Sequence, residues 1–295
     1  MMERRQFLIG AGGLGLLALS PARAASQAAL GGRRLAEAVA ALERRSGGRL
    51  GVALIDTGTR RRFSHRGDER YPLCSTFKFL LAADLLARAD RGAIDLDKRL
   101  PIAASHLANS DFVKSRVGRD ATLGELAHAI IEISDNDAAN LLLAEIGGPA
   151  ALTRFARAIG DGVTRLDRME PVSDAPSDLN DTTSPAAMAA DFERLLLGHV
   201  LKPASRATLT QWLVHSKTGI GRLRAGLPAG WRLAHKTGTG MHGSSNDAGV
   251  VWPTRGAPLI VAAYLTGSTL DDAGRDAVIA DVARAVAEAC AAGAA

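Results

Sequence analysis

The fold is organised around residues 75–86, which read Ser-Thr-Phe-Lys-Phe-Leu-Leu-Ala-Ala-Asp-Leu-Leu. Apolar side chains occupy nearly every side of this run, and such a pattern predicts a helix that is buried all round. We expect the helix to begin at Ser75, a residue type that caps helix N-termini, and to continue to about Arg91. The remaining elements must then pack around this helix.

Lys78 lies three residues after Ser75 and therefore on the same face of the predicted helix. Burial lowers the pKa of a lysine, and the neutral amine is a base. A serine with a base in reach is an activated nucleophile. The alternative is a capping serine beside a lysine whose charged end reaches water. Because Ser-x-x-Lys occurs by chance about once in a chain of this length, further motifs must decide.

The composition is typical of a globular protein, with 295 residues of which 47% are hydrophobic and 23% charged. This length suits one large domain or two interleaved layers. Arginines are spread along the chain and aromatic residues make up only 4%, which disfavours a nucleic-acid-binding protein. The seven histidines are scattered, without the spacing of metal ligands. We therefore expect no metal and no cofactor.

Residues 1–24 have the features of a cleaved export signal. Arg4 and Arg5 precede an uncharged run, and Ala22-Arg23-Ala24 offers a small-x-small cleavage site. Paired arginines are typical of the twin-arginine export route, whereas a membrane-spanning helix, the alternative, needs about 20 apolar residues. We expect a mature chain of residues 25–295 that works in the periplasm, with no stable membrane insertion.

Cys74 and Cys290 are the two cysteines of the chain. An exported protein could join them in a disulfide. The twin-arginine route generally carries chains that are already folded, so dependence on a disulfide is less expected. We predict that both are buried thiols.

The order of the predicted elements indicates two interleaved lobes. A helix over residues 34–46 precedes two β runs, and a block of helices separates these from three further strands and a closing helix. Because strands and helices do not alternate regularly, we predict an α/β protein of the α+β type, with a five-stranded antiparallel sheet flanked by helices. The sheet lobe comprises about 25–72 and 217–295, the all-helical lobe about 73–216, and the active site lies between them.

Three further clusters carry polar groups suited to catalysis. Ser134-Asp135-Asn136 lies between two predicted helices, and Lys236-Thr237-Gly238-Thr239-Gly240 ends a predicted strand, where glycine lets a ligand approach the backbone. Glu170 lies in the aperiodic segment 164–183, and so long a loop is usually functional. Each cluster alone also fits an ordinary cap, turn or polar loop. Lys-Thr-Gly recurs at 217–219 before no strand, and we interpret that copy as structural.

Ser-x-x-Lys, Ser-Asp-Asn and Lys-Thr-Gly, in this order, form a far more specific pattern than any one of them. The trio is characteristic of class A β-lactamases and penicillin-binding proteins. With Glu170-Pro171 and Asp181-Thr182-Thr183 added, the sequence resembles a class A β-lactamase over essentially the whole mature chain. The resemblance implies a monomeric enzyme whose partners are small-molecule β-lactams, and which hydrolyses penicillins and some cephalosporins and so gives antibiotic resistance.

The resemblance also implies a role for each matching residue. Ser75 would be the acylated nucleophile, Lys78 its proton acceptor or part of a relay, and Ser134 the proton donor to the lactam nitrogen. Glu170 would activate the water that releases the acyl-enzyme, and either Lys78 or Glu170 takes the acylation proton. The backbone amides of Ser75 and Thr239 would form the oxyanion hole. The implied substrate-binding residues are Asn136, Lys236, Thr237, Gly238, Thr239 and Arg222.

Several positions depart from the family pattern. Asp174 stands where the family has an asparagine that shares the deacylating water, so we expect Asp174 to position that water. The loop from Glu170 to Asp181 is shorter than in the family. Ser245 replaces a carboxylate-binding arginine, and Arg222 matches an alternative position to which we assign that role.

Three other functions stay open at this point. A penicillin-sensitive D-Ala-D-Ala peptidase would share the motif trio but would need no Glu170 loop. A β-lactam sensor would be acylated and would remain so, and a serine esterase could use the same fold. Glu170 distinguishes hydrolysis from acylation alone, because turnover requires a base that acts on the ester.

Overall fold

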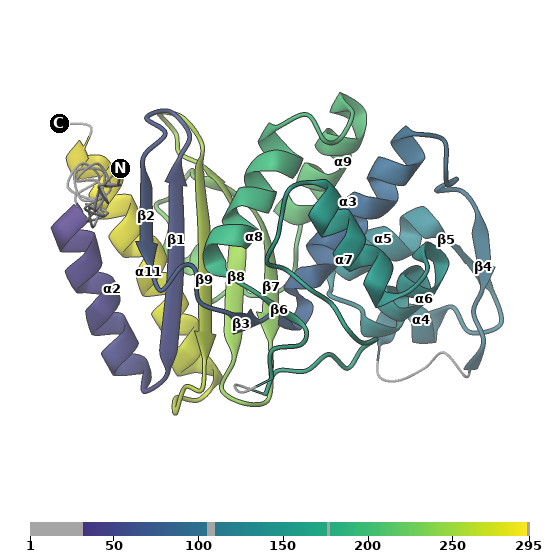
Figure 1. Ribbon diagram of the computed structural model, residues 1–295, viewed down its shortest axis with the longest axis horizontal. Helices are drawn as coiled ribbons and strands as arrows, with labels where there is room; N and C mark the ends of the chain where they lie inside the picture. Colours follow the sequence, from purple (N-terminus) through teal and green to yellow (C-terminus); the bar gives the residue numbers. More distant parts are fainter. Residues whose placement is uncertain (1–31, 105–109, 176–177, 294–295) are drawn as a thin grey trace, which may run out of the picture.

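The computed structural model describes residues 32–104, 110–175 and 178–293 (Figure 1). The predicted export signal, residues 1–24, lies outside this part of the chain. Among the described residues, no helix combines the length and apolarity that a membrane crossing requires.

A five-stranded antiparallel sheet has the strand order β2-β1-β9-β8-β7, which confirms the predicted sheet. In the β1–β9 pair, the first strand of the chain lies beside the last one: Arg49 is opposite Thr266, and Asp56 is opposite Leu259. The strands are β1 (Arg49–Asp56), β2 (Arg62–His65), β7 (Arg232–Thr239), β8 (Ser245–Trp252) and β9 (Leu259–Thr266).

Both faces of this sheet are buried. Leu50, Val52 and Leu54 of β1 belong to the core under α2 (Gly32–Ser46) and α11 (Asp272–Gly293). The alternate residues Ala53 and Ile55 belong to the core on the other side, since successive side chains of a strand face opposite ways. In Figure 1, α2 and α11 lie together on one side of the sheet, and the other labelled helices lie on the opposite side.

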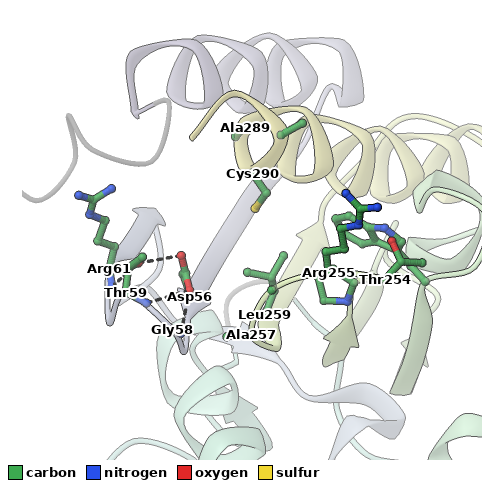
Figure 2. Close-up of a pocket in the computed structure, with 14 residues that line it drawn as sticks. Asp56, Gly58, Thr59, Arg61, Thr254, Arg255, Ala257, Leu259, Ala289 and Cys290 are labelled. Carbon is green, nitrogen blue, oxygen red and sulfur yellow. Dashed lines mark hydrogen bonds between the residues drawn. The ribbon is translucent and has the colours of Figure 1, made fainter. Parts of the chain in front are cut away.

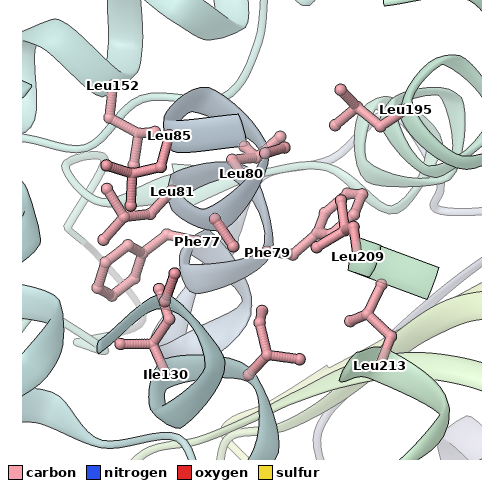
Figure 3. Close-up of a cluster of buried hydrophobic side chains, with 14 of the residues drawn as sticks. Phe77, Phe79, Leu80, Leu81, Leu85, Ile130, Leu152, Leu195, Leu209 and Leu213 are labelled. Carbon is pink, nitrogen blue, oxygen red and sulfur yellow. The ribbon is translucent and has the colours of Figure 1, made fainter. Parts of the chain in front are cut away.

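The helix α3 (Phe77–Asp90) runs through the centre of the helical lobe, and every side chain from Phe77 to Ala87 is buried. Phe79 stacks on Phe192 with 3.8 Å between ring centroids. Figure 3 shows side chains of α3 meeting leucines and an isoleucine from neighbouring helices. The prediction of a helix buried on all sides is therefore confirmed. Its neighbours include α5 (Leu123–Glu132), α6 (Asn136–Ile146), α7 (Pro149–Ala158), α8 (Pro185–Phe192), η3 (Glu193–Leu197) and α9 (Pro203–Val214).

The prediction that Ser75 caps the central helix is wrong. A short 3-10 helix, η1 (Cys74–Thr76), precedes α3, and the N-cap residue is Thr76. Cys74 has a positive φ of 44°, a conformation that is uncommon outside glycine and that turns the chain sharply. Ser75 consequently lies inside the turn, and its hydroxyl makes no capping bond.

Short elements too brief for a periodic signal complete the fold. Leu73 donates its backbone N–H to Asp181 over 2.8 Å, which ties the chain before Ser75 to the end of the 164–183 loop. A capping box begins α5, because Thr122 Oγ1 accepts from the Glu125 N–H, and the Glu125 side chain accepts from the Thr122 N–H. The short elements are β3 (Tyr71–Pro72), β4 (Arg99–Pro101), α4 (Asp111–Ser115), β5 (Asp120–Thr122), β6 (Thr182–Thr183) and α10 (Leu223–Gly226).

Candidate active site

Ser75 and Lys78 form the predicted pair. Lys78 Nζ donates to Ser75 Oγ over 3.0 Å, and Ser75 is half-buried whereas Lys78 is fully buried. Burial lowers the pKa of Lys78, although the nearby Glu170 carboxylate opposes this shift. A lysine amine that loses its proton here can accept the proton of the serine hydroxyl.

Ser134 lies between two lysine amines. Lys236 Nζ donates to its Oγ over 3.0 Å, and Lys78 Nζ lies 3.4 Å from the same oxygen. The Ser134 backbone has a positive φ of 62°, and its carbonyl accepts a bond from Lys78 over 2.8 Å. Burial and the charge of Lys78 hold the pKa of Lys236 well below its usual value. Ser75, Lys78, Ser134 and Lys236 thus form one continuous hydrogen-bonded chain.

The Ser-Asp-Asn segment is held by α4 and α6. Asp135 caps α6 by accepting from the Ala138 N–H over 2.8 Å, and its second oxygen accepts from the Phe112 N–H over 3.1 Å. Asn136 is exposed, and its side-chain oxygen accepts a hydrogen bond from Lys78. Ser110 Oγ accepts from the Asn136 N–H over 3.0 Å, a support that the sequence did not reveal.

Glu170 enters the site from the long loop. Its Oε1 forms an ion pair with Lys78 Nζ at 3.0 Å, and its side chain is only 8% exposed. Asn140 brackets the Glu170 backbone: its amide nitrogen donates to the Glu170 carbonyl over 3.1 Å, and its oxygen accepts from the Glu170 N–H over 2.7 Å. Sequence reasoning missed Asn140, whose place one helical turn after Asn136 was the available signal.

The two ends of the loop are closed by a buried carboxylate. Asp181 is fully buried, and its Oδ2 forms an ion pair with Arg168, whose Nε lies 2.9 Å away. It also accepts from the backbone N–H groups of Asp167 and Ser173, over 2.7 and 3.0 Å. These bonds fix the loop on both sides of Glu170.

The end of β7 lies against η1 because Gly238 has no side chain. A Cβ at Gly238 would stand 2.9 Å from Cys74 Cβ and 3.1 Å from Ser75 N. This close approach brings the strand end that carries Thr239 to the turn that carries Ser75. Their backbone amides are the two that the resemblance assigns to the oxyanion hole.

Arg222 reaches the site through Thr239. The guanidinium donates to Thr239 Oγ1 and to the Gly238 carbonyl, over 2.7 Å in each case, and its Nε lies 2.7 Å from Asp276 Oδ1. Only 6% of Arg222 is exposed. The arginine therefore supplies positive charge from behind the strand.

Asp174 makes its bonds away from the catalytic cluster. Its Oδ1 lies 2.8 Å from His242 Nδ1, and its Oδ2 accepts from the His242 N–H over 2.9 Å. The expected role of Asp174 in positioning water stays a prediction.

The second Lys-Thr-Gly copy also lies near the site, with Thr218 Oγ1 2.6 Å from Thr237 Oγ1.

A pocket of about 380 Å³ lies elsewhere, between the β1–β2 turn, the β8–β9 turn and the end of α11 (Figure 2). Its Asp56 carboxylate accepts from the Gly58 N–H and from the backbone and hydroxyl of Thr59. Cys290 also lines it, and burial raises the pKa of this thiol to about 11. A thiol that stays protonated is a poor nucleophile, so this pocket lacks the activated pair found at Ser75.

Both cysteines are free thiols. Cys74 is buried as predicted, and its burial raises the thiol pKa to about 12. Cys290 is half-buried, so the prediction of burial is wrong for this residue, which borders the pocket near the end of α11.

Within the described residues, no three His, Cys, Asp or Glu side chains gather in a way that could hold a metal ion.

Comparison with known proteins gives a consistent result. A family model described as the beta-lactamase enzyme family matches residues 34–290. The chain is 44% identical to beta-lactamase L2 of Stenotrophomonas maltophilia, with 96% of this chain and 98% of that protein covered. It is 43% identical to a beta-lactamase of Streptomyces albus G, with 97% and 96% covered.

Solved structures agree with these relatives. An ancestral class A beta-lactamase is 58% identical and superposes with a TM-score of 0.85, covering 86% of this chain and 99% of that one. The putative class A beta-lactamase PenP from Rhodopseudomonas palustris is 51% identical and has the same TM-score of 0.85 and the same coverage of 86% and 99%. Both similarities extend over nearly all of the described residues.

Proposed function

This chain belongs to the beta-lactamase enzyme family and is a class A serine β-lactamase, and from that premise we propose that Ser75 opens the ring of penicillins and cephalosporins. The observation that carries the proposal is the single hydrogen-bonded chain of Ser75, Lys78, Ser134 and Lys236. Such a chain provides a nucleophile, a base and a proton route in one place.

In the acylation step, Lys78 accepts the Ser75 proton while Oγ attacks the lactam carbonyl carbon. The backbone amides of Ser75 and Thr239 stabilise the negative oxygen that develops. As the ring C–N bond breaks, a proton passes through Ser134 Oγ to the nitrogen. The second proton route open to the site runs through the Glu170 carboxylate, which lies 3.0 Å from Lys78 Nζ.

The substrate is held by groups around this cluster. Lys236 and Arg222 provide positive charge for the carboxylate that penicillins and cephalosporins carry beside the ring nitrogen. Thr237, Gly238 and Thr239 offer hydroxyls and backbone along β7. The exposed Asn136 amide is placed for the acylamino side chain.

In the deacylation step, Glu170 removes a proton from a water molecule, which attacks the ester carbonyl and frees Ser75. Asn140 and Asp181 hold the Glu170 loop in place for this step. This held carboxylate favours hydrolysis over the sensor alternative, which remains acylated and needs no base that acts on the ester. It also favours a β-lactamase over the peptidase alternative, which would need no Glu170 loop.

We further propose that the enzyme is exported through the twin-arginine route and works in the periplasm as a monomer. The support is the sequence of residues 1–24, with Arg4 and Arg5 before an uncharged run. Replacing both arginines with lysine should retain the protein in the cytoplasm, which cell fractionation would detect. Unchanged export would contradict this route.

The proposed function is tested with purified residues 25–295 and excess benzylpenicillin, by following ring opening and protein mass together. We expect sustained turnover with only a transient adduct on Ser75. In Glu170→Ala, turnover should fall about 10²–10⁴-fold and the acyl-enzyme should accumulate. Glu132→Ala removes a carboxylate that pairs with the exposed Lys217 and is the control. A persistent adduct on the unaltered protein would instead indicate a sensor or peptidase.

A further inference from the structure

The Glu170 loop is attached to the sheet at one further point, through Asp174. Both oxygens of this carboxylate bond to His242, one to the ring and one to the backbone N–H, over 2.8 and 2.9 Å. The Asp174 side chain is only 14% exposed. Each oxygen of this carboxylate is therefore held by the turn after β7, so the side chain joins the loop to that turn.

His242 offers a firm anchor because its turn is bonded to the rest of the sheet. The turn joins β7 to β8, and Gly240 donates to the Ser244 carbonyl over 3.0 Å. Gly267, just after β9, donates to the His242 carbonyl over 3.0 Å. The Asp174–His242 contact therefore connects the loop to a fixed part of the sheet.

The loop and the end of β7 also touch directly at Gly240. A Cβ on Gly240 would stand 2.2 Å from Asp174 Oδ2, so only glycine leaves the carboxylate in its place. Thr239, the preceding residue, carries one proposed oxyanion amide, and Glu170 lies four residues before Asp174. A β-lactam whose carbonyl oxygen is held by the Thr239 amide, as proposed above, is therefore bound one residue away from this contact.

We propose that Asp174 and His242 form a strap that fixes the gap between the Glu170 loop and β7, and thereby limits the size of the β-lactam side chain that the site accepts. The inference rests on the proposed function of the same site. In this proposal Asp174 does not orient the deacylating water, the role expected from the sequence. It is a positioning residue instead, because its carboxylate acts through the loop and not on the reacting atoms.

The test compares His242→Ala and Asp174→Ala with Met241→Ala, a control in the same turn whose side chain is 94% exposed. Substrates are benzylpenicillin and a cephalosporin with a bulky oxyimino side chain. Both strap variants should lower KM for the bulky substrate by about fivefold, the size of one partly exposed polar contact, and His242→Ala should leave kcat for benzylpenicillin within about twofold. The control should change neither constant.

Hydrogen exchange provides a readout that does not depend on turnover. Amides of residues 172–175 should exchange faster in both strap variants than in Met241→Ala. If acyl-enzyme accumulates in Asp174→Ala but not in His242→Ala, then Asp174 positions the deacylating water, and the proposed strap is overturned. Unchanged exchange in both variants would also overturn it. Failure of the proposed function itself would appear separately, as absence of turnover by the unaltered protein.

Discussion

The two copies of Lys-Thr-Gly occupy very different surroundings. Lys236 on β7 is fully buried and donates to Ser134 Oγ and to the Thr237 carbonyl. Lys217, in the connection between α9 and α10, has a side chain that is 68% exposed and pairs with Glu132 at 2.9 Å. The same three residues thus provide a catalytic-site cation in one place and a surface ion pair in the other. Burial and partners, not the tripeptide, decide the chemistry.

The two copies are nevertheless in contact with each other. Thr218 Oγ1 lies 2.6 Å from Thr237 Oγ1. A Cβ on Gly219 would come within 2.4 Å of Thr237 Cγ2. The copy at 217–219, which we interpreted as structural, therefore packs against the strand that carries the other copy.

The largest difference between the copies should appear when each lysine is removed. Lys236→Ala is expected to lower kcat/KM for benzylpenicillin by about 10²–10³-fold, the usual loss when a preorganised electrostatic group is deleted. Lys217→Ala should change it by less than about twofold, because an exposed ion pair contributes little. Steady-state kinetics would measure both, and thermal denaturation would check that each variant is folded. Equal losses in the two variants would refute the distinction.

The glycine of the second copy should be intolerant of a side chain. Gly219 has a φ of 62° and no room beside Thr237, so Gly219→Ala should reduce the free energy of unfolding by about 1–3 kcal/mol. Gly92→Ala is the matched control, since Gly92 has a φ of 69° with nothing within 4 Å. Chemical denaturation of both would separate backbone strain from the clash. A loss at Gly219 no larger than at Gly92 would show that the contact with Thr237 is unimportant.

The smallest effect is expected at the hydroxyl pair. Thr218→Val keeps the shape of the side chain but removes one partner of the bond to Thr237, at a cost of about 1 kcal/mol. This corresponds to roughly a fivefold loss in kcat/KM if the bond positions β7. The double variant Thr218→Val/Thr237→Val should lose less than the sum of the single variants. Thr210→Val, which removes a hydroxyl bond inside α9, is the control. Losses in kcat/KM that add strictly in the double variant would show that the two hydroxyls do not act together.

Sequence reasoning was most successful where a long periodic run or an ordered set of motifs was available. The all-apolar run after Ser75 predicted a buried helix, and α3 is buried from Phe77 to Ala87. The cap assigned to Ser75 was wrong, because the positive φ of Cys74 places Ser75 in a turn before α3, and the residue type of Cys74 gives no sign of this conformation.

Contacts between distant segments could not be predicted in the same way. Asn140 brackets Glu170 thirty residues away, and His242 bonds to Asp174 across 68 positions. The place of Asn140 one helical turn after Asn136 indicates only which face of the helix it shares, and no local pattern around His242 indicates its partner. These bonds exist only because the long loop is laid between α6 and the end of β7.

By itself, the sequence determined the class of fold, the buried central helix and the set of catalytic residue types, because these follow from local periodicity and from motifs a few residues long. Tertiary structure alone decided which groups support them: Asn140 behind Glu170, Ser110 behind Asn136, and His242 on Asp174. The physical reason is that burial is encoded by neighbouring residues, whereas the partner of a buried polar group depends on how separate segments pack.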